Sequence, residues 1–240
     1  MENLLSELAD RKYPEVHRKA SRIFNKFIEA IHRLKNALKD SRRFYQTMSN
    51  GFKATIHSGE EIPLREVLTF LHNTADRSIE IHKEFEGLRA TFFGLYGKVN
   101  ELRGDIRRIT GSNDDKSNLA IVVGLTASVL TAIAAPQIYL PIVAASSIAG
   151  GGYIVKKGQD DNNVLDKVKS GMTSLRNYSK KIADIIEEMD AMKTASAINN
   201  YQELPGLNTE AYKYYMEDLA AVAKENYDEI EHMIQKLTNI

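Results

Sequence analysis

The feature that most constrains this chain is a run of 39 residues without a charged side chain, from Ser117 to Val155. The run lies between Lys116 and Lys156, in a 240-residue chain of which 27% is charged, so chance does not explain it. Left exposed, an apolar segment of this size would form a patch well beyond the roughly few hundred Å² that soluble monomers tolerate. We therefore expect Leu119 to Val155 to be covered by flanking helices or by another chain in the soluble form.

The run divides into two arms around Pro136, namely Leu119 to Ala135 and Ile138 to Val155. As helices these arms would be about 26 and 27 Å long, against about 30 Å for the hydrocarbon core of a bilayer. Backbone groups in lipid have to be satisfied internally, so a helical hairpin is the expected form. Charged residues flank both ends of the run, which predicts that both ends lie on the same aqueous side.

Three sets of hairpin residues are assigned on this basis. The large apolar side chains are predicted to insert into the membrane: Leu119, Ile121, Val122, Val123, Leu125, Val129, Leu130, Ile133, Ile138, Leu140, Ile142, Val143, Ile148 and Ile154. Small residues four apart allow helices to approach closely in lipid, which predicts a packing face of Ala120, Gly124, Ser128, Ala132, Ser147 and Gly151. The prolines Pro136 and Pro141 are predicted to form the turn.

The rest of the chain carries four long amphipathic patterns, with apolar residues alternately three and four apart. They run from about Pro14 to Gly51, from Leu64 to Thr110, from Leu165 to a loop at Tyr201–Gly206, and from Asn208 to the C-terminus. The expected fold is all-α, an elongated bundle of long antiparallel helices with an apolar helical hairpin as an insertion. Its expected segments are residues 1–116, the hairpin 117–155, and residues 156–240.

Two sets of residues make the expected bundle more specific, namely its predicted core and three glycines. The apolar stripes predict a core of Ala20, Phe24, Phe27, Ile31, Leu34, Leu38, Phe85, Leu88, Phe92, Leu95, Val99, Leu102, Ile106, Ile109, Leu165, Val168, Met172, Leu175, Ile182, Ile186, Met189, Tyr212, Tyr215, Leu219, Val222, Ile230, Met233 and Leu237. Three glycines in the second pattern, Gly87, Gly94 and Gly97, predict a kink or a close approach of helices.

Composition argues against several function classes. The 32 basic and 32 acidic residues balance, whereas a dedicated nucleic-acid binder usually has a basic surplus. There is no cysteine, no two of the six histidines are four residues apart, and we find no catalytic motif, so neither a metal, a cofactor nor enzymatic activity is expected. The N-terminus lacks the pattern of a secretory signal, which predicts a soluble form that is cytoplasmic or secreted without a classical signal peptide.

The order of these elements resembles a known family. A long helical bundle interrupted by a charge-free, glycine- and alanine-rich hairpin is similar to the α-helical pore-forming toxins of the cytolysin A and haemolysin BL type, and the matching stretch is Asn118 to Lys157. A looser similarity exists to apolipoprotein L, which has a comparable apolar hairpin after charged helices. The resemblance is architectural, and no motif is shared residue by residue. It implies a cytolysin that changes from a soluble to a membrane-inserted form and assembles into a ring.

Three functions remain open from the sequence. The leading hypothesis is a membrane-permeabilising protein whose partners are a lipid membrane and either further copies of itself or a second protein of a multi-component assembly. The second is a soluble structural or adaptor bundle in which the hairpin is core or oligomer interface. The third is a resident membrane protein with a two-pass anchor.

Overall fold

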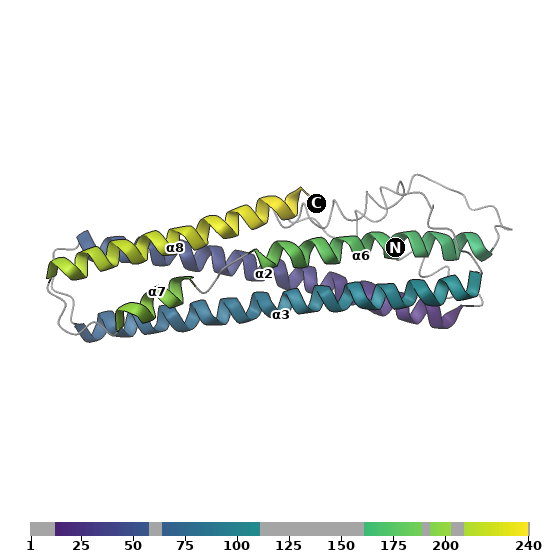
Figure 1. Cartoon of the computed structure of the whole chain (residues 1–240), viewed down its shortest axis with the longest axis horizontal. Coiled ribbons are helices and arrows are strands. Elements are labelled where there is room, and N and C mark those ends of the chain that lie inside the picture. The colour runs from purple at the N-terminus through teal and green to yellow at the C-terminus, as the bar shows by residue number, and fades with distance from the viewer. Residues whose placement is uncertain (1–12, 58–63, 111–160, 189–192, 203–208, 240) are drawn as a thin grey trace. The chain divides into compact units, whose positions relative to one another are not determined.

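The computed structural model describes residues 13–57, 64–110, 161–188, 193–202 and 209–239, which form five helices and no strand (Figure 1). In chain order these are α2 (Pro14–His57), α3 (Leu64–Thr110), α6 (Asp161–Glu187), α7 (Lys193–Gln202) and α8 (Thr209–Thr238). The helices pack against one another, so the prediction of an all-α helical bundle is confirmed. The predicted hairpin insertion, residues 117–155, lies outside the described residues.

The described helices divide into two compact units. Unit 1 contains α2 up to Arg33, α3 from Arg89, and α6 as far as Asp184. Unit 2 contains α2 from Leu34, α3 up to Leu88, α7 and almost all of α8. Each unit therefore combines helices from both sides of the charge-free run.

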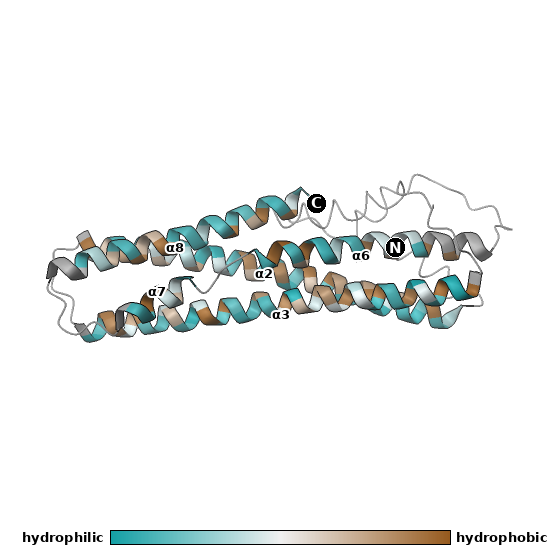
Figure 2. Ribbon diagram, in the orientation of Figure 1, coloured by the Kyte–Doolittle hydropathy of each residue, from teal (hydrophilic) through white to brown (hydrophobic). Residues whose placement is uncertain are grey.

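The core of unit 1 joins three helices. Phe27 of α2 and Phe92 of α3 meet edge to face, with ring centroids 6.0 Å apart. Leu165, Met172 and Ile182 of α6 are fully buried. An aromatic pair of this geometry contributes about 0.5–1.5 kcal/mol beyond the burial of its area. Apolar residues recur at intervals of three and four along each helix, as Figure 2 illustrates for the described residues.

The core of unit 2 is a cluster of ten buried residues from α2, α3, α7 and α8: Phe52, Val67, Leu71, Ala75, Ile198, Tyr215, Met216, Leu219, Ala220 and Ala223. Ser49 donates a hydrogen bond of 3.0 Å to the carbonyl oxygen of Ala220, which ties α2 to α8. Phe52 packs edge to face on Phe70, and Met48 accepts a hydrogen bond from Thr74. Met48 contacts Thr74 and Phe52 contacts Phe70, so residue numbers increase along α2 in the direction in which they decrease along α3. α2 therefore runs antiparallel to α3, and it runs antiparallel to α8 as well.

The predicted limits agree with the structure for α3, for the start of α2 and, within a residue or two, for α8, and they differ at the end of α2 and in the third pattern. α2 continues to His57, six residues beyond the predicted end at Gly51. The third predicted pattern is not one helix, because α6 ends at Glu187 and α7 begins at Lys193. No proline or glycine marks this break in the sequence. Instead, Ile198 of α7 is buried in the core cluster of unit 2, so tertiary packing overrides the local propensity to continue the helix.

Most stripe residues of the described part are buried, but Phe24, Val222 and Ile109 are not, and the side chains of Met189 and Tyr212 lie outside what the structure describes. Phe24 is only half-buried, because Ile23 takes its place on the inner face of α2. A helix of 3.6 residues per turn drifts by about 20° per heptad against a strict seven-residue repeat, and this moves flanking positions out of the core. Ile109, in the last turn of α3, is 46% exposed.

The prediction that Gly87, Gly94 and Gly97 mark a close approach of helices is wrong. A Cβ atom placed at any of the three would meet no described atom within 4 Å. α3 remains one helix through all of them.

Candidate functional site

The predicted membrane-active residues all lie outside the described part of the chain. The large apolar residues from Leu119 to Ile154, the small-residue face from Ala120 to Gly151, and the turn at Pro136 and Pro141 fall within residues 111–160. Among the described residues, no helix is both long and apolar enough to span a membrane. Within the same residues, His, Asp and Glu side chains form no group of three that could hold a metal.

The described structure does show where the charge-free segment is attached. Arg176 of α6 donates a hydrogen bond of 3.3 Å from Nη1 to Oδ1 of Asn100 on α3. Three residues earlier on α6, Thr173 lines a cavity together with Gly104 and Arg107 of α3. Residue numbers therefore decrease along α6 in the direction in which they increase along α3, which means that the two helices are antiparallel. The last residue of α3 and the first of α6 consequently lie at the same end of this helix pair (Figure 1).

A basic cavity lies between these two helices, close to that end. We call it the arginine pocket, and its described lining residues are Asn100, Arg103, Gly104, Arg107, Thr173 and Arg176. Its volume is about 550 Å³. Three of these residues carry a guanidinium group and none is acidic.

Several contacts hold the side chain of Arg176 in the arginine pocket. Its guanidinium lies 5.8 Å from the ring centroid of Tyr96, within the range of a cation–π contact. Nε and Nη2 donate hydrogen bonds of 3.2 and 3.1 Å to Oδ1 of Asn177. With the bond to Asn100, these contacts fix one guanidinium at the wall of the pocket.

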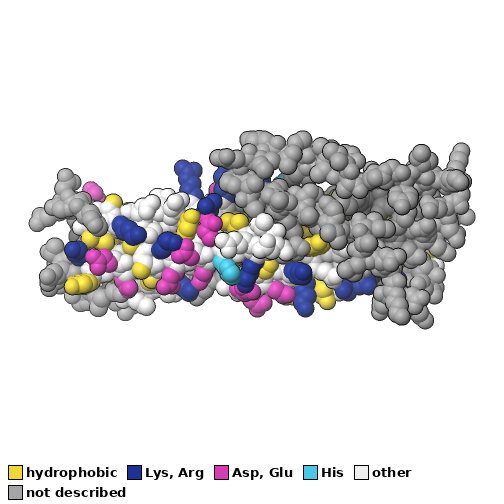
Figure 3. Space-filling model, turned by 90° about the horizontal axis from the view of Figure 1, so that it is seen from above, with side chains coloured by type: hydrophobic (Ala, Val, Ile, Leu, Met, Phe, Trp, Pro, Cys, Tyr) yellow, Lys and Arg dark blue, Asp and Glu magenta, His cyan; other side chains and the backbone are white. Residues whose placement is uncertain are grey.

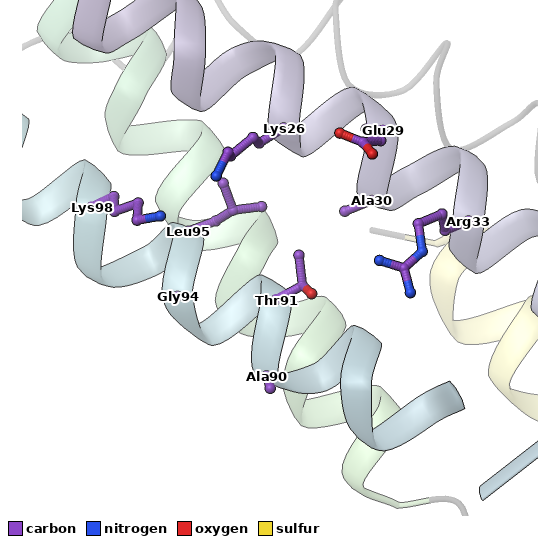
Figure 4. A pocket seen from close by; sticks show the side chains of 9 residues that line it. All are labelled: Lys26, Glu29, Ala30, Arg33, Ala90, Thr91, Gly94, Leu95 and Lys98. Carbon is purple, nitrogen blue, oxygen red and sulfur yellow. The ribbon is translucent and has the colours of Figure 1, made fainter. Parts of the chain in front are cut away.

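A second basic groove lies between α2 and α3 of unit 1 (Figure 4). Its volume is about 450 Å³, and it exists because the facing positions Ala30, Ala90 and Gly94 carry small side chains or none. The polar residues at its rim are Lys26, Glu29, Arg33, Thr91 and Lys98. Glu29 offsets one of the three basic residues, and all four charged side chains are exposed to solvent.

Asp105 of α3, which follows Gly104 of the arginine pocket in sequence, is bonded to one residue of α2 and to one of α3. Asp105 accepts a hydrogen bond of 2.8 Å from Lys19 and another of 2.5 Å from Arg108. The Lys19 hydrogen bond, opposed by partial burial and assisted by the charges of Lys19 and Arg108, lowers the pKa of Asp105. The same hydrogen bond raises the pKa of Lys19.

Unit 2 contains a buried polar cluster between α7 and α8. Thr194 donates a hydrogen bond of 2.6 Å to Oδ1 of Asn226, and both residues are completely buried. Beside it, Lys193 bonds to Glu229 at 2.5 Å. The hydrogen bonds of Thr194 and Lys193 both cross from α7 to α8, so this cluster holds the two helices together.

Charges on the described surface are mixed. Figure 3 shows basic and acidic side chains interspersed over the described part of one face. Arg42 pairs with Glu231 and lies 5.9 Å from the ring centroid of Tyr227, which links α2 to α8. Such exposed pairs contribute about 0–1 kcal/mol each, so they orient helices more than they stabilise them.

Sequence reasoning did not find the arginine pocket. Asn100, Arg103 and Arg107 follow the three- and four-residue spacing of one helix face, which was a usable signal. Arg176 and Thr173 could not be assigned to the same site, because their pairing with α3 depends on the packing of α6 across a long intervening segment.

The fold and the described cavities define an all-α helical-bundle protein with a basic pocket. Comparison with known protein families, with curated proteins and with solved structures finds no match to this chain.

Proposed function

We propose that this chain is a membrane-inserting, pore-forming helical protein that changes from a soluble form to an oligomeric membrane form through the segment 117–155. One observation carries the proposal: 39 consecutive residues lack charge in a chain that is otherwise 27% charged. Arms of 17 and 18 residues are near the length needed to cross a bilayer, and small residues recur in both at the four-residue spacing of membrane helix contacts.

The antiparallel pairing of α3 with α6 supports this proposal. It places Thr110 and Asp161, the described residues on either side of the segment, at one end of a helix pair, as a hairpin that enters and leaves a membrane from one side requires. The described helices that flank the segment are amphipathic and richly charged, so they remain in water or pack with other copies. No catalytic role, cofactor or nucleic-acid partner belongs to the proposal.

The proposed partners are a lipid membrane and either further copies of the chain or a second component of one assembly. The proposed soluble form is cytoplasmic or leaves the cell without a classical signal peptide, and it acts as a toxin or cytolysin on a target membrane.

A soluble structural or adaptor bundle is the second candidate. It is favoured by the burial of most heptad residues in both units, which gives the described helices cores built from their own apolar side chains. In that case the segment would be additional core or an oligomer interface.

The variant Val129→Asp separates the two candidates. A charge at the centre of a bilayer costs about 3 kcal/mol on insertion scales, so this variant should release little dye from liposomes while its melting temperature stays at the wild-type value. A segment that is core in the soluble protein would instead acquire an unpaired buried carboxylate, and the melting temperature would fall.

The matched control is Leu68→Asp, which places the same charge at a position on α3 that is 47% exposed. It should leave both dye release and melting unchanged. Loss of dye release together with a collapsed melt in Val129→Asp would favour the adaptor bundle, and wild-type protein that releases no dye would refute pore formation.

A further inference from the structure

We infer that the arginine pocket between α3 and α6 binds a phosphate group, and that the source of this phosphate is the headgroup of an anionic phospholipid. The choice of lipid as source rests on the proposed function, whereas the phosphate chemistry rests on the pocket alone. The described residues that line it belong to α3 and α6.

The donors of the pocket suit a phosphate. Guanidinium groups present a planar fork of N–H donors that matches two phosphate oxygens at once, and charge-assisted hydrogen bonds of this type are about twice as strong as neutral ones. Arg103 and Arg107, one turn apart on α3, face the same cavity as Arg176 of α6. Two helices therefore place guanidinium groups around one half-open pocket.

The neutral lining residues fit the same chemistry. Asn100 accepts from Arg176 through Oδ1, so its amide nitrogen is the end that can donate to a ligand. Thr173 already donates its hydroxyl proton to the carbonyl oxygen of Lys169 at 2.8 Å. Gly104 has no side chain, and a Cβ there would meet no described atom within 4 Å, so the floor of the pocket is open. About 550 Å³ accommodates a phosphate together with the group that it esterifies.

Compensation of the helix dipole does not explain all three arginines. Arg107 lies in the last turn of α3, where a basic residue stabilises the negative end of the helix. That effect falls off within the last turn, whereas Arg103 is a turn further back and Arg176 belongs to another helix.

The position of the pocket indicates a lipid as the source. Arg107 lies three residues before the end of α3, and the segment 111–160 starts there. If residues 117–155 enter a bilayer, this end of the α3–α6 pair comes to the headgroup layer, where anionic lipids attract basic residues. A phosphate bound between α3 and α6 would then tie the inserted form to the membrane surface.

The test compares two double variants of equal charge. Arg107→Gln with Arg176→Gln removes two arginines of the pocket, and Arg18→Gln with Arg108→Gln removes two exposed arginines of unit 1 that do not line it. Circular dichroism and melting curves establish that both variants keep the helical fold. Arg103 is left in place because its Nε is buried.

In the first arm, inorganic phosphate is titrated at constant ionic strength, and binding is followed through the NMR signals of the arginine Nε–H groups. Wild type and control should bind alike, and the pocket variant about tenfold more weakly or not at all. In the second arm, vesicles of phosphatidylcholine with phosphatidic acid are sedimented with each protein, and vesicles of phosphatidylcholine alone give the baseline. The pocket variant should lose most of the binding that phosphatidic acid adds.

Each outcome either supports or overturns the inference that the arginine pocket binds a phosphate. A deficit of the pocket variant in both arms, or with vesicles alone, supports a lipid phosphate, and a deficit with inorganic phosphate alone supports the site but assigns it a soluble phosphate. Equal behaviour of the two double variants in both arms overturns the inference, because the arginines then act only through net charge. Dye release by wild type is recorded in the same vesicles, so failure of pore formation is seen separately from failure of the pocket.

Discussion

Thr194 and Asn226 share a hydrogen bond of 2.6 Å between two side chains that are both fully buried, on helices α7 and α8 of unit 2. The bond connects a ten-residue helix, too short to be stable alone, to a helix of 30 residues. A buried polar pair of this kind has to be made correctly, since an acceptor left without its donor is costly.

We therefore predict that Thr194→Val destabilises the protein by about 1–3 kcal/mol, although it keeps the shape of the side chain. The matched control is Thr69→Val, at an exposed position where the hydroxyl donates to a carbonyl of its own helix at 2.8 Å. That control should change the free energy of unfolding by less than about 0.5 kcal/mol. Urea denaturation measures both, and equal effects would contradict the role of the buried bond.

A second prediction concerns the aromatic contact in unit 1. Phe92→Ala should cost about 3–5 kcal/mol, because Phe92 is completely buried and its ring meets Phe27. The neighbouring residue provides the control, since Phe93 is 41% exposed and lies beside Arg89. Phe93→Ala should cost about 1 kcal/mol or less. If chemical denaturation ranks the two variants in the opposite order, the assigned inner face of α3 is wrong.

A third prediction concerns acid. A carboxyl group whose pKa is lower in the folded protein adds stability that is fully present above its unfolded pKa of about 3.9 and is lost as the pH falls through the folded pKa. Asp105 is such a group. Asp105→Asn should therefore melt below wild type at neutral pH, and the difference should shrink as the pH falls below about 4.

Lys19 does not reverse this trend, because its raised pKa keeps the ammonium charged throughout the acid range. Asp40→Asn, at an exposed position of α2, is the control and should change melting less at neutral pH. A difference between Asp105→Asn and wild type that stays constant from neutral to strongly acid pH would show that the charge of Asp105 is not its source.

A fourth prediction concerns the small-residue face of the first hairpin arm. Gly124→Leu should strongly reduce dye release, since a large side chain prevents close helix approach in the membrane form. Its helical content in solution should change little. Thr126→Leu, two residues along and on the opposite side of a helix, should keep its dye release. Release by Gly124→Leu at the wild-type level would remove the packing argument.

The fold was largely predictable because most of it depends on local periodicity. α3 has the limits that its apolar spacing and the stop at Thr110-Gly111 predict. The break between α6 and α7 was not predictable, since nothing in Glu188 to Met192 disfavours a helix. The break depends on the packing of Ile198 against residues of α2, α3 and α8, and no local sequence pattern encodes this packing.

The two candidate sites differ in the same way, because one is visible in the sequence and the other depends on tertiary packing. Absence of charge is a property of the sequence, so the hairpin residues could be chosen without a structure, and their assignment stays a prediction. The arginine pocket depends on which turn of α6 faces Arg103 and Arg107. That register is set by packing, and the spacing of residues on one helix cannot supply it.

The antiparallel register of α3 and α6 has a consequence for loop entropy. Because the two helices meet where the segment 111–160 leaves and returns, closing that connection depends only weakly on its length, at about 0.6 kcal/mol for each doubling. Insertions or deletions in the segment can therefore accumulate at little thermodynamic cost to the helices that hold it. The bundle and the segment are free to diverge in sequence at different rates.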